Sequence, residues 1–120
     1  ISDIKKAYKI FLKENLKTLI SGSIARKNPY FNQVERAKSR IKLVKNMKNK
    51  VLRRQDTPIV YDMNASIYIW DRKTLLSSDT LFNKNTGIYV MPEIRSIDID
   101  TELDFRIVEH LLKNMSNHDI

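Results

Sequence analysis

Two aspartates separated by one residue, Asp98 and Asp100, have the spacing that points most directly to chemistry. In an extended chain alternate side chains project to the same side, so both carboxylates share one face and Ile97 and Ile99 the other. Neighbouring carboxylates repel one another unless a cation lies between them. Mg²⁺ suits such oxygen ligands and leaves its other positions to water and substrate phosphates. The pair predicts a magnesium site; the alternative is a turn residue, Asp98, followed by a helix cap, Asp100.

Two further groups of polar residues come earlier in the chain. Arg53-Arg54-Gln55-Asp56 lies just before an apolar run, and its planar guanidinium groups suit a carboxylate or phosphate bound at two points. The segment 61–66 brings Tyr61, Asp62 and Asn64 to the start of a predicted strand, where they can hydrogen-bond a sugar. The alternatives are the end of a basic loop for the arginines and a plain turn residue for Asn64.

Several kinds of site are excluded by the residues that the chain lacks. It contains no cysteine, which rules out a disulfide scaffold and a cysteine-ligated zinc site. Its two glycines, Gly22 and Gly87, are too far apart for a glycine-rich phosphate loop. Neither His110 nor His118 has a nucleophile or ligand partner nearby in the sequence, so we do not expect a catalytic histidine.

The positive charge is concentrated in one segment. The 120 residues carry 22 Lys and Arg against 14 Asp and Glu, a net charge of +8. Residues 35–54 contain nine of these cations against Glu35 alone, so the rest of the chain is neutral. Such a block can meet nucleic acid, phosphates or an acidic partner, or it is a solvated face. Within it, residues 36–43 alternate charged with less polar side chains, which indicates an extended segment with two unlike faces.

The periodicity of the apolar residues predicts the elements that position these groups. A helix capped by Ser2 or Asp3 is expected to run to about residue 14 and to pack on a sheet. Strands are expected at 18–24, 59–61, 66–70 and 87–91, a turn at 28–32 and a short helical turn at 74–76. A last helix from residue 102, capped by Asp100 or Thr101, should bury Leu103, Ile107, Val108, Leu111, Leu112 and Met115. This pattern predicts one α/β domain over residues 1–120.

No stretch approaches the roughly 18 apolar residues that a membrane span needs, so we expect no membrane partner. The absence of cysteine is compatible with the cytoplasm, the location we predict.

The order of these segments resembles a known family. Residues 53–58, 61–68 and 95–104 together look like the C-terminal half of an acylneuraminate cytidylyltransferase, or CMP-sialic acid synthetase. Residues 25–32 resemble the bacterial relatives that activate nonulosonic acids. The most specific part is Ser-Ile-Asp-Ile-Asp-Thr-Glu at 96–102. The resemblance extends over nearly the whole chain.

The resemblance implies a reaction and a fold. In this family the anomeric hydroxyl of a nine-carbon keto-acid sugar attacks the α-phosphate of CTP with Mg²⁺ assistance, giving the CMP-sugar and pyrophosphate. The implied fold is the C-terminal half of a Rossmann-like nucleotidyltransferase with a mixed sheet. The stretch of about 28–50 would be an extended dimerisation excursion that contributes to the active site of the neighbour, so a homodimer is expected. Its positive charge would attract CTP and the acidic sugar.

The family's functional positions carry over to seven residues of this chain. Asp98 and Asp100 match the carboxylates that bind the metal and act in catalysis. Arg54 matches a catalytic arginine near the acidic sugar and the nucleotide phosphates. The remaining matches line the substrate site, with the last reaching the sugar from a partner subunit: Gln55, Asn64, Tyr68 and Phe82.

Two departures from the family pattern limit what the resemblance implies. Asn64-Ala65-Ser66 replaces the usual Asn-Gly-Ala, and Asp62 stands where some members have a second arginine, so the identity of the sugar stays open. The family's N-terminal half, with its Gly- and Lys-bearing CTP loop, has no counterpart in these residues. We therefore expect that the 120 residues alone do not turn over CTP.

Two other functions are alternatives. One is the related cytidylyltransferase for the eight-carbon keto-sugar of lipopolysaccharide. The other is a small basic module that binds nucleic acid. Tyr61, Tyr68 and Trp70 are not interleaved with the basic run, as a base-stacking surface requires, so no nucleic-acid partner is expected.

Overall fold

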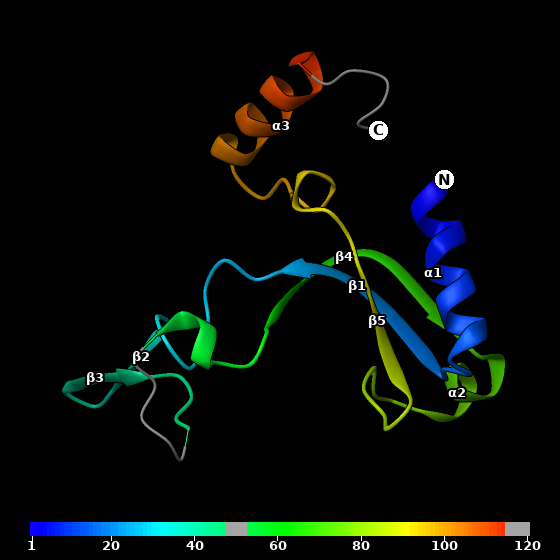
Figure 1. Ribbon diagram of the computed structural model, residues 1–120, viewed down its shortest axis with the longest axis horizontal. Helices are drawn as coiled ribbons and strands as arrows, with labels where there is room; N and C mark the ends of the chain where they lie inside the picture. Colours follow the sequence, from blue (N-terminus) through cyan, green and yellow to red (C-terminus); the bar gives the residue numbers. More distant parts are fainter. Residues whose placement is uncertain (48–52, 115–120) are drawn as a thin grey trace. The chain divides into compact units, whose positions relative to one another are not determined.

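A computed structural model describes residues 1–47 and 53–114 of the chain. The elements follow in the order α1 (Ser2–Lys13), β1 (Thr18–Ile24), β2 (Val34–Ala37), β3 (Arg40–Leu43), η1 (Arg54–Asp56), β4 (Tyr61–Trp70), α2 (Arg72–Ser77), β5 (Thr86–Val90), η2 (Glu93–Arg95) and α3 (Glu102–Asn114), where η marks a 3₁₀ turn (Figure 1). They group into two compact units, a first of Ile1–Ser23 with Met63–Ile120 and a second of Ile24–Asp62. The predicted α/β class is confirmed.

A three-stranded mixed sheet with the order β4-β1-β5 forms the centre of the first unit. β1 pairs with β5 in parallel, from Thr18 opposite Thr86 to Gly22 opposite Val90. Figure 1 shows that β4 runs in the opposite direction to β1. β4 is a ten-residue strand, so the predicted strand at 66–70 continues back to Tyr61, whereas residues 59 and 60 lie outside it.

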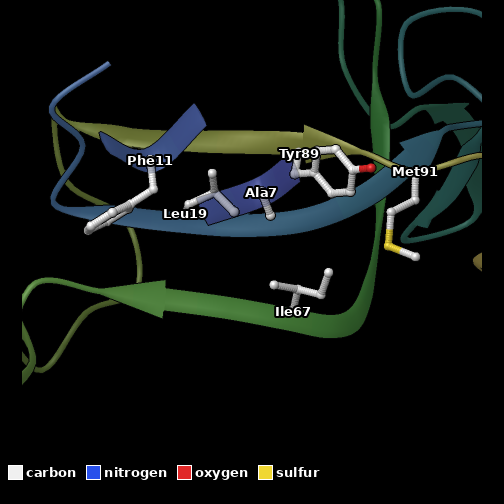
Figure 2. Packing of buried hydrophobic residues seen from close by; sticks show 6 residues of the cluster. All are labelled: Ala7, Phe11, Leu19, Ile67, Tyr89 and Met91. Atoms are coloured by element: carbon white, nitrogen blue, oxygen red, sulfur yellow. The ribbon is translucent and has the colours of Figure 1, made fainter. Parts of the chain in front are cut away.

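One face of this sheet carries the hydrophobic core. The buried side chains of α1 are Ala7 and Phe11, which recur at helical spacing and face the sheet. They pack with one another and with side chains of β1, β4 and β5 and the residue after β5, as Figure 2 shows: Leu19, Ile67, Tyr89 and Met91. The prediction that this helix packs on a sheet is confirmed.

The start of α1 differs from the prediction. Neither Ser2 nor Asp3 caps the helix, whose N-cap is Ile1 without a side-chain bond. The Asp3 carboxylate instead accepts hydrogen bonds from the Tyr89 hydroxyl, at 2.7 Å, and from Nε and Nη2 of Arg95, at 3.0 and 3.1 Å. A charged donor at two points binds a carboxylate more strongly than helix N–H groups do, and this contact replaces the expected cap.

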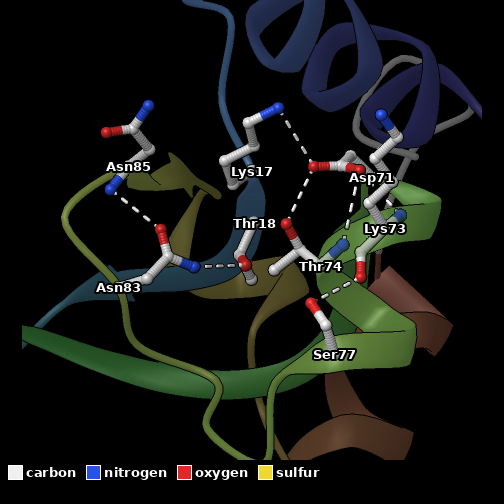
Figure 3. A network of polar contacts seen from close by, with 8 residues as sticks. All are labelled: Lys17, Thr18, Asp71, Lys73, Thr74, Ser77, Asn83 and Asn85. Atoms are coloured by element: carbon white, nitrogen blue, oxygen red, sulfur yellow. Dashed lines mark hydrogen bonds and ion pairs between the residues drawn. The ribbon is translucent and has the colours of Figure 1, made fainter.

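A polar network joins the start of β1 to α2 and to the loop that follows it (Figure 3). Asp71 caps α2 through the Lys73 and Thr74 N–H groups, and it also binds the Thr74 hydroxyl and Lys17. These contacts, that of the Thr74 hydroxyl first, lower the pKa of Asp71 to about 2. Asn83 donates to the buried Thr18 hydroxyl at 2.9 Å and so holds the loop against the sheet.

The second unit contains a two-stranded antiparallel hairpin, β2–β3, where the sequence predicts an extended segment. Its register places Glu35 opposite Lys42, and these two side chains form an ion pair at 3.1 Å. Glu35 and Lys42 lie on one face of the hairpin. The opposite face carries three apolar side chains and one arginine: Val34, Ile41, Leu43 and Arg36. The two unlike faces are therefore present, except that Arg36 lies on the apolar one because the turn at Lys38 and Ser39 reverses the chain.

The last helix, α3, begins with a capping box. The Thr101 hydroxyl accepts from the Asp104 N–H, and the Asp104 carboxylate accepts from the Thr101 N–H at 2.9 Å. Of the two predicted caps, Thr101 is therefore the correct one. The predicted buried face is wrong for the described residues of α3, none of which is buried, and Met115 lies outside the described range. Apolar residues at helical spacing show that one face of a helix could pack against another element. They do not show that the described part of the chain contains such an element.

No helix in the described ranges is long and apolar enough to cross a membrane.

Candidate functional site

A pocket of about 300 Å³ in the second unit contains two of the predicted site residues, Arg54 and Gln55. Nη2 of Arg54 donates to the carbonyl oxygens of Ala25, at 2.9 Å, and Arg26, at 2.7 Å. These bonds fix the plane of the guanidinium group beside the end of β1. Within the described residues, Nε and Nη1 of Arg54 form no hydrogen bond, so these donors remain open to a ligand.

Asn28, which the sequence marks only as part of a turn, organises the wall of this pocket. The buried side chain donates through Nδ2 to the Thr57 hydroxyl and to the Pro58 carbonyl, both at 3.0 Å, and its Oδ1 accepts from the Tyr30 N–H. Thr57 in turn donates to the Arg54 carbonyl at 2.6 Å. The Asn-Pro pair indicates a turn. No local signal reveals that the Asn28 side-chain amide bonds to two residues that lie 29 and 30 positions further along the chain.

Asn64 is buried at the centre of a hydrogen-bond network in the first unit. Its Oδ1 accepts from the buried Ser21 hydroxyl at 2.7 Å, and its Nδ2 donates to the Ser96 hydroxyl at 2.9 Å and to the Met91 sulfur at 3.2 Å. Ser21 also accepts from the Ile67 N–H at 2.8 Å. The predicted sugar-pocket asparagine thus links β1, β4 and the segment after η2 by its side chain.

Next to it, Ala65 has a φ of 49°, in the left-handed region that favours glycine. The left-handed backbone at Ala65 changes which side chains of β4 are buried. Asn64 and Ile67 are three residues apart and both are buried. In a regular strand, two residues three apart would lie on opposite faces of the sheet. Ala65 therefore acts as a local irregularity that turns the Asn64 side chain into the interior. This is also the position where the family pattern has glycine, which gives a physical reason for that preference.

Tyr68 and Phe82 have different surroundings from Asn64. Tyr68 stacks on Trp70, with ring centroids 5.4 Å apart and planes inclined by 15°, and it is 37% exposed. Since Ile67 and Ile69 pack with the core on the α1 side, Tyr68 and Trp70 lie on the other face of β4. Phe82 is exposed in the loop held by Asn83, and its N–H donates to the Thr80 hydroxyl. Both aromatic rings are available to a ligand or a partner.

Asp98 and Asp100 lie in the irregular segment between η2 and α3, and both are exposed. Neither carboxylate accepts a hydrogen bond from the described residues, since the helix cap is formed by Thr101 and Asp104 instead. Within residues 1–47 and 53–114, no three His, Cys, Asp or Glu side chains gather in a way that could hold a metal ion. Two free carboxylates nevertheless fit Mg²⁺, which takes one or two protein carboxylates together with water and substrate phosphates.

Comparisons with known proteins give a consistent picture. The chain is 52% identical over 103 residues to a CMP-N,N'-diacetyllegionaminic acid synthase of Campylobacter jejuni, a match that covers 84% of this chain and 43% of the relative. It is 46% identical over 112 residues to the post-translational flagellin modification protein B of Campylobacter coli, covering 93% of this chain and 47% of the relative. No family model matches.

A more distant relative is an N-acylneuraminate cytidylyltransferase of Streptococcus agalactiae, 30% identical over 110 residues, or 90% of this chain and 26% of the relative. The relatives of this chain thus include proteins named as cytidylyltransferases, and the matches extend over most of the chain. More narrowly, the chain is similar to acylneuraminate cytidylyltransferases over most of its own residues, and it spans less than half the length of the curated relatives that it matches.

Proposed function

We propose that the full-length protein containing this chain transfers CMP from CTP to a nonulosonic acid and releases pyrophosphate. The observation that carries this proposal is the 52% identity to a relative named for CMP-N,N'-diacetyllegionaminic acid synthesis. The present chain would be the C-terminal half of that enzyme and of its Rossmann-like fold, so the CTP loop would lie in another part of the protein. The 120 residues alone should therefore be inactive.

In this proposal Arg54 and Gln55 bind the anionic substrates. Since Nη2 of Arg54 is held by two backbone carbonyls, the guanidinium plane is fixed before a ligand arrives. The open Nε and Nη1 donors suit the carboxylate of the sugar or a phosphate oxygen at two points. A preset guanidinium stabilises negative charge that develops as pyrophosphate leaves, without reorganisation.

Asp98 and Asp100 would hold Mg²⁺, because both carboxylates are exposed and free of bonds to the described residues. When bound, Mg²⁺ supplies charge neutralisation on the phosphates. The aspartates themselves present acceptor oxygens from a segment that immediately precedes α3. In the first unit, Asn64, Tyr68 and Phe82 would contribute to sugar binding. Asn64 would act from the interior of the sheet, Tyr68 through its ring, and Phe82 by reaching into the site of a second copy.

The second copy would dock on the excursion of about residues 28–50, whose last residues lie outside the described range. The β2–β3 hairpin leaves Val34 and Ile41 about 60% exposed on one face, and a lone two-stranded hairpin is only marginally stable in water. Covering that face with the same face of a second copy would bury it. We therefore propose a homodimer. A cytoplasmic location is proposed separately, because the absence of cysteine is compatible with it.

The test is a pyrophosphate-release assay on the full-length protein with CTP and Mg²⁺. Three sugars should be compared: N,N'-diacetyllegionaminic acid, N-acetylneuraminic acid and the eight-carbon keto-sugar of lipopolysaccharide. We expect turnover with a nine-carbon acid, with the legionaminic derivative giving the highest kcat/KM. Turnover with the eight-carbon sugar alone, or with none of the three, would contradict the proposal. The 120-residue chain should give no pyrophosphate under the same conditions.

A further inference from the structure

The segment that carries Asp98 and Asp100 is anchored to the first unit at one end by a buried side-chain network. Ser96 accepts from Nδ2 of Asn64 at 2.9 Å and donates to the Pro92 carbonyl at 3.1 Å. Among the described residues, the next backbone-to-backbone hydrogen bond after Ser96 is the one that the Phe105 N–H donates to the Thr101 carbonyl. Asp98 is two residues beyond this anchor, a reach on the order of 7 Å in an extended chain. The place of the carboxylates therefore depends on where Ser96 is held.

The network that holds Ser96 is rigid because it is buried and each of its polar groups has a partner. Asn64 is 4% exposed and Ser21 is 1% exposed. The Ser21 hydroxyl donates to Oδ1 of Asn64 and accepts from the Ile67 N–H, so it fixes the amide orientation and satisfies a backbone group beside the irregularity at Ala65. No buried side-chain nitrogen or oxygen in the described ranges lacks a partner. A buried polar chain of this kind has one favoured arrangement.

We infer that Ser96, held through Asn64 by Ser21, is a positioning residue for the carboxylates of Asp98 and Asp100. This inference rests on the proposed function, in which those aspartates bind the metal ion. Within the described residues the Ser21 hydroxyl bonds to Asn64 and the Ile67 N–H, and the Ser96 hydroxyl to Asn64 and the Pro92 carbonyl, so we assign neither a catalytic role. Ser21 and Ser96 would instead fix the position of the metal-binding carboxylate oxygens. Their replacement should therefore weaken metal binding.

The chain offers a closely matched control for Ser96. Ser77 donates its hydroxyl to the carbonyl four residues earlier, that of Lys73, at 2.8 Å, just as Ser96 donates to Pro92. Ser77 lies on α2 and is exposed, and no bond joins it to Asn64. Ser77→Ala thus removes the same local bond without disturbing the network. Ser96→Thr keeps the hydroxyl and should restore the network.

The experiment measures Mn²⁺ binding to the full-length protein from the electron paramagnetic resonance signal of the free ion, together with the unfolding temperature. Loss of one hydrogen bond in the anchor should raise the Mn²⁺ Kd of Ser96→Ala about three- to tenfold. Ser77→Ala and Ser96→Thr should bind like the wild type. Wild-type affinity in Ser96→Ala, or an equal loss in Ser77→Ala, would overturn the positioning role.

Two further variants separate this inference from the proposed function. Asp98→Asn should weaken Mn²⁺ binding more than Ser96→Ala does. If Asp98→Asn binds Mn²⁺ normally, the metal assignment is wrong and the positioning role falls with it; if only Ser96→Ala binds normally, the positioning role alone is wrong. If Ser96→Ala fails to fold, Ser21→Ala takes its place, with an expected rise in Kd of about two- to fivefold. Normal affinity in that variant would contradict the inference.

Discussion

Asp3 in α1 and Arg95 in η2, 92 positions apart in the chain, form an ion pair joined by two hydrogen bonds of 3.0 and 3.1 Å. The Arg95 guanidinium, together with the Tyr89 hydroxyl, holds the pKa of the Asp3 carboxyl below its usual range. Burial and the bond to Asp3 raise the pKa of Tyr89 to about 12. Because Arg95 directly precedes Ser96, this pair fixes the same end of the aspartate segment that Asn64 holds.

Replacing Asp3 with Asn should lower the unfolding temperature of the full-length protein by on the order of 5 °C at pH 7. Since folding lowers the pKa of Asp3, its stabilisation is present above the unfolded value of about 4 and is lost as the pH falls through the folded value. The difference between wild type and Asp3→Asn should therefore be constant near neutrality and shrink below about pH 4. Thermal unfolding at a series of pH values measures it.

The matched control is Asp79→Asn, because the Asp79 carboxylate is exposed and forms no hydrogen bond or ion pair with the described residues. It should unfold like the wild type at every pH. If the Asp3→Asn protein is as stable as this control, the ion pair between Asp3 and Arg95 does not contribute to the stability of the protein.

Replacing Ala65 with Gly should stabilise the protein by about 0.5–1 kcal/mol, because a φ of 49° strains an alanine and suits a glycine. Ala37→Gly, in β2 and without a positive φ, should have the opposite sign and destabilise by roughly 0.5–1 kcal/mol. Urea unfolding of both variants measures the difference. A loss of stability in Ala65→Gly would show that the backbone at Ala65 is not strained by the alanine side chain.

The regular elements could be predicted because their signals are local. The buried run at 18–24 coincides with β1, and the apolar spacing of Ala7 and Phe11 marks the face of α1 that packs. Predicting Asn64 in the interior would have required two further facts, the left-handed backbone of Ala65 and the position of Ser21, 43 residues away. Alanine gives no signal for a left-handed residue, and a serine in a strand has no preferred distant partner.

The helix caps were harder to predict for a related reason. Asp3 and Asp100 both have side chains that suit an N-cap. Asp3 binds Arg95 instead, and the N-terminus of α3 is capped by the Thr101–Asp104 capping box and not by Asp100. Competition from a charged partner far along the chain cannot be read from a window of a few residues. The metal and substrate roles came only through the family resemblance, and they stay predictions.

Replacing Arg54 with Ala should lower kcat/KM of the full-length protein by about 100-fold, because it removes a guanidinium fixed by two carbonyls. Arg54→Lys should not restore the activity, since an ammonium group cannot hold both carbonyls and bind an anion at two points. Arg53→Ala is the control: that neighbouring side chain is 72% exposed and contacts Asp56 at 3.8 Å. If both alanine variants lose the same activity, general positive charge and not the Arg54 geometry is responsible.

Replacing Asp100 with Asn separates a metal ligand from a helix cap. Its carboxylate accepts no hydrogen bond from the described residues, so the unfolding temperature should not change, whereas kcat with Mg²⁺ should fall by about two orders of magnitude or more. Asp104→Asn should do the reverse, because the Thr101 N–H and hydroxyl donate to that carboxylate at 2.9 and 2.6 Å. Thermal unfolding and steady-state kinetics on both variants measure this. An Asp100→Asn protein with full activity would remove Asp100 from the metal site.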